Sequence, residues 1–313
     1  HRQPVGQRAG GRVPALRDAG ERRHGPRLEY TTGNKDLFGG RDSVHDHGDQ
    51  TIQSACFKLN TKSVKMPQHR QSVLIIILVS LITFSNALSN GFVGDDHLIV
   101  VNNAFYETWA NFPKLFTPGY ITDSDEAFNF ENFFHTGSVA YRPVLSATFF
   151  FDYWLWQRAA FGYHLHNVVV HVLNAILVYF IFFLILKDPA LSLFGAVLFA
   201  VHPLKSEAVC AIGYRADLLA AFFFLLAFLS YILRARCGAW KRKAIEALSH
   251  VALLLALFSK ESAVVFVGML AAYDVLVKKE KMSDVLKHFY GRYLGYLLIT
   301  LFYLYIYFYV FRN

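Results

Sequence analysis

The chain has 313 residues, of which 54% are hydrophobic and 16% aromatic, and its mean hydropathy is +0.31. This composition is too apolar for a soluble globular domain and predicts an integral membrane protein. The formal net charge is +8, but residues 1–65 hold 12 Lys and Arg against 7 Asp and Glu, so most of the excess lies there. The other cations flank apolar segments and do not share one solvated face, which argues against nucleic-acid binding.

Residues 1–65 are rich in Arg, Gly, His and Asp and rarely place two apolar residues together. Such a segment buries too little surface to offset chain entropy, so we expect disorder. Met66 then precedes Pro67 and an apolar run, as at the start of many membrane proteins. We therefore expect residues 1–65 to be upstream sequence translated from a misplaced start, with a native basic tail as the alternative. Residues 66–313 form the second predicted unit, a transmembrane domain.

Seven apolar segments in this domain approach the ~20 residues that a membrane span requires. They cover residues 73–88, 164–186, 190–212, 217–233, 244–259, 263–277 and 293–311. The first also resembles a signal peptide, because basic residues precede a short apolar core that ends in Asn86-Ala87-Leu88, but the later spans favour an uncleaved anchor. The predicted fold is an all-α polytopic bundle of about seven transmembrane helices.

Two cationic segments predict the orientation of this bundle. Residues 234–243 contain five Lys and Arg and no acid, and residues 278–292 contain five more, so both are predicted to be cytoplasmic. Counting spans then places the amino terminus inside and the loop 89–163 outside. That loop carries 8 acids against only Lys114, Arg142 and Arg158, which agrees with the count. Within it, the aromatic segments 100–116 and 141–156 are predicted to be interfacial helices.

The same count places most other ionisable residues on the outer side, which predicts an active site that opens outward. These residues are Asp95, Asp96, Arg142, His164, His166, His202, Lys205, Glu207, Arg215, Asp217, Lys260 and Glu261. On the second predicted span, Asn167, His171 and Asn174 are spaced four and three residues apart and share one helical face. They either hydrogen-bond to other helices or line a substrate cavity.

Pro203 is predicted to break the third span and free backbone groups near the interface. His202, Lys205 and Arg215 would then surround a phosphate, with Glu207 as the balancing acid. The alternative is snorkelling cations with an ion pair between Glu207 and Arg215. Lys260 and Glu261 interrupt a later apolar stretch as an outer turn, and pairing with each other is the alternative to a substrate role.

Several chemistries find no support in the motifs. No Walker phosphate loop or GxSxG nucleophile elbow occurs, which disfavours nucleotide and serine hydrolysis. Cys56, Cys210 and Cys237 form no CxxC or CxxxxH pattern, and the histidines lack HExxH spacing, so no metal site is indicated. We expect no cofactor, with a divalent metal as an open alternative.

The order of motifs is nevertheless specific. Phe-x-x-Asp-Asp follows the first span, then Tyr-Arg-Pro, Gly-Tyr-His-x-x-Asn-x-x-x-His-x-x-Asn, His-Pro-x-x-x-Glu ending in Arg-x-Asp, and a late Ser-Lys-Glu. Over residues 66–311 this set resembles the membrane half of GT-C glycosyltransferases. The nearest resemblance is to the transmembrane and tetratricopeptide-repeat O-mannosyltransferases, which are themselves similar to dolichyl-phosphate-mannose protein mannosyltransferases. No such repeat follows the last span, so we expect either a fragment or a diverged form.

The resemblance implies a transferase that moves a sugar, mannose by expectation, from a polyprenyl or dolichyl phosphate to an acceptor hydroxyl, for example on protein Ser or Thr. It implies a lumenal or periplasmic site in the endoplasmic reticulum or a bacterial inner membrane. Asp95, with Asp96 beside it, takes the acidic catalytic position. Arg142, His202, Lys205, Arg215 and Lys260 become candidates to offset charge on the departing phosphate. A transporter or flippase for the same lipid and a noncatalytic scaffold are the alternatives.

Overall fold

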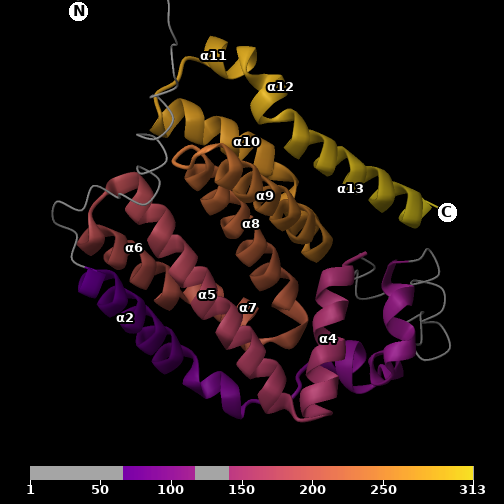
Figure 1. Ribbon diagram of the computed structural model, residues 1–313. Coiled ribbons are helices and arrows are strands. Elements are labelled where there is room, and N and C mark those ends of the chain that lie inside the picture. Colours follow the sequence, from indigo (N-terminus) through magenta and orange to yellow (C-terminus); the bar gives the residue numbers. More distant parts are fainter. Residues whose placement is uncertain (1–65, 117–140, 313) are drawn as a thin grey trace, which may run out of the picture. The chain divides into compact units, whose positions relative to one another are not determined.

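The structure of this protein is a computed structural model in which the placement of residues 66–116 and 141–312 is described (Figure 1). These residues form helices and connecting turns, and no strand occurs among them. The all-α prediction is therefore confirmed for this part of the chain. Two ranges lie outside the described residues. They are residues 1–65, for which we expect disorder, and residues 117–140 in the middle of the outer loop.

The first half of the described chain contains two long helices separated by the outer loop. Helix α2 (Met66–Phe84) continues into a 3-10 turn (Ser85–Ser89). The loop then forms a π-helical turn (His97–Val101), two 3-10 segments (Ala104–Glu107 and Trp109–Phe116) and helix α4 (Pro143–Trp156). The predicted helix at 141–156 is thus present, whereas 100–116 is a series of short turns. Helix α5 (Ala160–Leu186) follows directly.

The second half begins with a broken helix. Asp188 caps α6 (Pro189–Val201) by accepting a hydrogen bond from the Leu191 N–H at 2.9 Å. As predicted, the helix ends before Pro203, and α7 (Ser206–Cys210) resumes after a 3-10 turn at an angle of 53°. The remaining helices are α8 (Arg215–Arg234), α9 (Ala239–Ser259), α10 (Phe266–Ala272), α11 (Met282–Lys287), α12 (Phe289–Arg292) and α13 (Leu294–Arg312).

Helix α5 lies at the centre of the packing, in contact with α2, α6 and α8. Helix α8 packs along α9, which in turn contacts α13. One buried apolar cluster joins α4, the start of α5 and the start of α8, and includes Phe149, Phe150 and Tyr163. A second cluster joins α8, α9, α10 and α13 and includes Leu253, Phe266 and Tyr296. The first cluster surrounds the polar network described below.

Among the described residues, three helical segments are long and apolar enough to cross a membrane: 68–89, 160–186 and 212–234. The bent pair α6 and α7 makes a fourth if it is one span. This supports an integral membrane protein. The other three expected spans coincide with α9, with a broken series of short helices from 261 to 277, and with α13. The count of seven is not confirmed and stays a prediction.

Candidate functional site

The paired acids Asp95 and Asp96 lie in a tight turn after the first span. Gly94 adopts a left-handed conformation (φ 55°), which glycine tolerates without strain, and the chain then enters the π-helical turn. Asp95 is exposed, whereas Asp96 is only 2% exposed. The two adjacent carboxylates therefore occupy different environments, one open to solvent and one inside the protein.

Backbone amides hold the buried carboxylate of Asp96. Its Oδ1 accepts a hydrogen bond from the Gly213 N–H at 2.8 Å, and its Oδ2 accepts one from the Val93 N–H at 3.2 Å. Both oxygens are thus engaged, and the first bond ties the loop after α2 to the residues just before α8. His164 adds a third tie, because its Nε2 lies 3.4 Å from the Gly91 carbonyl oxygen.

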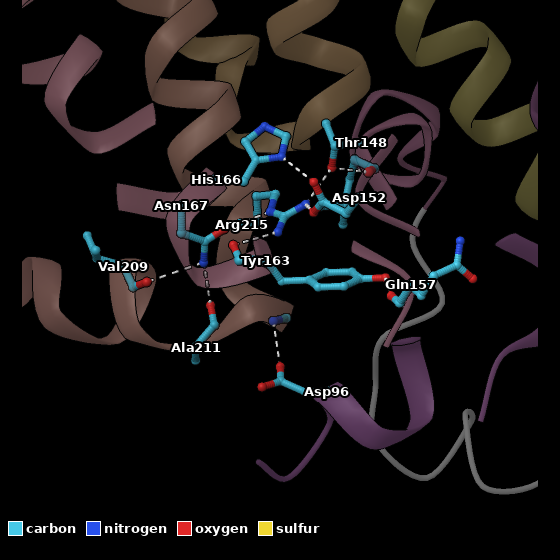
Figure 2. A network of polar contacts seen from close by, with 12 residues as sticks. Asp96, Thr148, Asp152, Gln157, Tyr163, His166, Asn167, Val209, Ala211 and Arg215 are labelled. Atoms are coloured by element: carbon cyan, nitrogen blue, oxygen red, sulfur yellow. Dashed lines mark hydrogen bonds and ion pairs between the residues drawn. The ribbon is translucent and has the colours of Figure 1, made fainter. Parts of the chain in front are cut away.

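Arg215 lies two residues beyond Gly213 at the start of α8 and is completely buried (Figure 2). Its Nη1 donates to a carboxylate oxygen of Asp152 and, at 3.0 Å, to the Thr148 hydroxyl, both on α4. Its Nη2 donates to the Tyr163 carbonyl at 3.0 Å. The other Asp152 oxygen lies 2.7 Å from Nδ1 of His166. A buried charge with this many partners is stabilised in place.

Asn167, in the second turn of α5, completes this network. Its Oδ1 accepts from Nε of Arg215 at 2.6 Å, and its amide donates to the carbonyls of Val209 and Ala211 at 3.3 and 3.2 Å (Figure 2). One side chain thus satisfies backbone groups that the break after α7 leaves free. The predicted polar face of α5 therefore makes interhelical hydrogen bonds at this position.

The same holds one and two turns further along α5. His171 Nε2 lies 3.0 Å from the Ala200 carbonyl, and the Asn174 amide donates to the Leu218 carbonyl at 3.0 Å. His164 and His171 each keep a buried Nδ1 without a hydrogen-bond partner, and so does Oδ1 of Asn174. These three buried atoms on α5 can each take a further partner.

A second group of charges encloses the start of α8. Lys260 Nζ lies 2.7 and 2.8 Å from the two oxygens of Asp217. Oε1 of Glu261 accepts a hydrogen bond from Nη2 of Arg142 at 2.9 Å. The alternative that Lys260 and Glu261 pair with each other is therefore wrong, as is the pairing of Arg215 with Glu207. Consecutive residues bind different helices. Three ion pairs thereby connect the start of α8 and the turn after α9 with each other and with both ends of α4. They are Arg215 with Asp152, Lys260 with Asp217, and Arg142 with Glu261.

Glu261 stands outside the spanning segments, and its surroundings alter its acidity. Partial burial alone would raise the pKa of this carboxyl group. Hydrogen bonds from its own backbone and from Arg142, together with the charges of Arg142 and Lys260, outweigh that effect and lower the pKa below its ordinary value. Glu261 is thus held as a carboxylate facing a guanidinium.

The residues around Pro203 are less enclosed. His202 Nδ1 accepts the Leu204 N–H at 3.2 Å and so caps the 3-10 turn. Lys205 Nζ lies 5.0 Å from the centre of the Phe199 ring, a cation-π contact, and Glu207 is exposed. No group of three or more His, Cys, Asp or Glu suited to a metal ion occurs among the described residues. The assignment of His202, Lys205 and Glu207 to phosphate binding stays a prediction.

Sequence reasoning missed two members of the buried network, Thr148 and Asp152, and did not select His166 as a site residue. The available signal was Asp152 itself, a single acid within the aromatic run Thr-Phe-Phe-Phe-Asp-Tyr-Trp. A lone carboxylate in such a helix needs a buried partner. Nothing in the spacing identifies that partner as Arg215, 63 residues away.

Fold and site together define an all-α integral membrane protein in which a buried ion pair supports an acidic loop between its first two long helices. Comparison with curated proteins extends this description. The chain is 32% identical over 221 residues to mouse protein O-mannosyl-transferase TMTC1, covering 66% of this chain and 22% of the relative. It is 29% identical to mouse TMTC4 (65% and 29%) and 26% identical to protein O-mannosyl-transferase F38B6.6 of Caenorhabditis elegans (69% and 30%). The resemblance found in the motifs is confirmed: over the matched region the chain is similar to these O-mannosyl-transferases.

The chain spans between 22% and 30% of the length of these three relatives. No family model matches the chain. No solved structure matches it either.

Proposed function

We propose that this chain forms the membrane part of a mannosyltransferase that transfers mannose from a polyprenyl or dolichyl phosphate to a hydroxyl group of a protein. The names of its relatives support the sugar and the protein acceptor. The lipid donor, the lumenal or periplasmic side and a GT-C bundle of seven spans belong to the same proposal, and the endoplasmic reticulum is its location in a eukaryotic host.

The observation that carries this proposal is the unequal environment of the paired acids. Asp96 has both oxygens occupied by backbone N–H groups, which fixes the loop. Asp95 is exposed on that fixed loop. A general base must reach an acceptor hydroxyl while being held in one geometry. Asp95 therefore acts as the base in our proposal, and Asp96 positions it.

The departing phosphate requires positive charge. Arg142 and Lys260 suit this role better than Arg215, because their side chains are 20% and 25% exposed whereas that of Arg215 is buried and fully paired. Their partners Glu261 and Asp217 orient them in the absence of substrate. His202 and Lys205 at the break after α6 are further candidates for the same phosphate, with Glu207 as the neighbouring acid.

The test is transfer of radiolabelled mannose from polyprenyl-phosphate mannose to protein by the chain in membranes. Loss of a general base lowers the rate on the order of 100-fold or more, so Asp95→Asn should abolish detectable transfer. Asp284→Asn, which removes an acid from α11, serves as the matched control and should transfer normally. Equal transfer by Asp95→Asn and the unaltered chain would refute the assignment. Binding and translocation of the lipid without cleavage would favour the flippase alternative.

A further inference from the structure

The end of α8 opposite Arg215 brings two cationic segments together. Residues 234–243 and 278–292 are separate in the sequence, but both meet at Tyr231. Its hydroxyl donates to buried Asp274 at 2.5 Å. The centre of its ring lies 4.0 Å from Cζ of Arg234 and 5.4 Å from Nζ of Lys278. The two segments therefore come together at this end of α8.

The acids at this end are already paired. Arg234 binds Glu246 at 2.9 Å and Lys278 binds Asp274 at 2.7 Å. Arg292 binds Glu280 at 2.5 Å. Lys287 lies 3.5 Å from Asp284. Each of these acids thus has its negative charge matched by a neighbouring cation.

Arg236 donates to the Leu184 carbonyl, and five other cations of the two segments have no ion pair in the described part of the chain. We call them the basic surface: Lys241, Arg242 and Lys243 at the start of α9, and Lys279 and Lys281 before α11. All five are exposed. Concentrated positive charge without a counter-charge repels itself, so it indicates an anionic partner.

Exposed apolar side chains adjoin these cations. Trp240, next to Lys241, is 83% exposed, and Leu286 and Tyr290 on α11 and α12 are 64% and 80% exposed. Aromatic and aliphatic side chains beside Lys and Arg are typical of segments that lie among lipid headgroups. An acidic protein segment would match the charge but would leave these apolar groups in water.

We propose that the basic surface binds anionic phospholipid headgroups and enriches such lipids around the ends of α9 and α11. This inference is independent of the transferase proposal. Membrane surface potentials give about a fivefold enrichment for each cation, and salt screens the attraction over about 10 Å at 0.1 M. The binding site thus requires negative charge on the lipid and not a particular headgroup.

Fluorescence quenching tests the proposal in bilayers that contain the reconstituted chain. Brominated phosphatidylserine and brominated phosphatidylcholine are compared at equal mole fraction, and the Trp240 signal is obtained by subtracting the Trp240→Phe variant. We expect several-fold stronger quenching of Trp240 by the anionic lipid at low salt, and near equality in 1 M salt. Equal quenching at low salt would overturn the proposal, and no quenching by either lipid would overturn it in favour of an acidic protein partner.

Charge variants sharpen this result. The triple variant Lys241→Gln, Arg242→Gln, Lys243→Gln should lose most of the preference for the anionic lipid. Lys287→Gln serves as the control, because this exposed cation already faces Asp284, and it should retain the preference. A triple variant that keeps the full preference would show that the basic surface does not select the lipid.

Discussion

The carboxylate of Asp96 accepts the backbone N–H of Gly213 at 2.8 Å, across 117 residues of sequence. This bond joins the acidic loop to a segment whose next side chain but one, Arg215, is anchored in α4 and α5. The position of Asp95 thereby depends on a buried ion pair that does not touch it.

Replacing Gly213 with Ala should disturb the acidic loop. A Cβ atom there would lie 3.3 Å from Cδ1 of Ile99 in the acidic loop, which must give by a few tenths of an ångström, and 3.5 Å from Oδ1 of Asp96, an ordinary van der Waals contact. Overpacking of this kind costs about 1 kcal/mol. We expect transfer to fall about tenfold while the chain stays folded in the membrane. Gly238→Ala is the control, because no atom lies within 4 Å of its Cβ position, and it should leave transfer unchanged.

Asp152→Asn should strongly destabilise the chain. It leaves the guanidinium of Arg215, which is 0% exposed, without its counter-charge, and breaking a buried ion pair costs about 3–5 kcal/mol. The free energy of unfolding in detergent measures this loss. Asp217→Asn removes a carboxylate that is 42% exposed and paired with Lys260, so it should cost at most about 1 kcal/mol. Similar losses for the two variants would contradict the special role assigned to the buried pair.

The sequence predicted the helical segments well because apolar runs of near-spanning length dominate this chain. It located the break at Pro203 for the same local reason, since proline cannot continue a helix. It did not predict the partners of Arg215, Lys260 and Glu261. Each pairing joins residues more than 40 positions apart, and several acids satisfied every cation equally well on charge alone. Only the packing of α4, α8 and α9 against one another selects among them.

The pairing of Arg142 with Glu261 should respond to acid. The pKa of Glu261 is lower in the folded chain than its ordinary value of 4.5, so the pair stabilises the fold fully above pH 4.5. That contribution is lost as the pH falls through the lowered pKa. Because the Glu261 side chain is 41% exposed, it amounts to less than about 1 kcal/mol.

Thermal unfolding of the unaltered chain and of Glu261→Gln measures this effect between pH 3 and pH 7. The difference in midpoint should be constant from pH 7 to pH 5 and shrink below pH 4.5. A difference that persists unchanged at pH 3 would mean that Arg142 gains nothing from the ionised carboxylate.

Thiol labelling should reveal the orientation on which the outward-facing site depends. In a chain whose Cys56, Cys210 and Cys237 are replaced by Ser, single cysteines are introduced as Val93→Cys and Trp240→Cys, at positions that are 71% and 83% exposed. In sealed microsomes, whose outer surface is the cytoplasmic face, a membrane-impermeant maleimide should label the cysteine at 240 at once. The cysteine at 93 should react only after the membrane is permeabilised, because Lys and Arg accumulate on the cytoplasmic side and the acidic loop lies on the other. The reverse pattern would place Asp95 in the cytoplasm and exclude a lumenal transfer reaction.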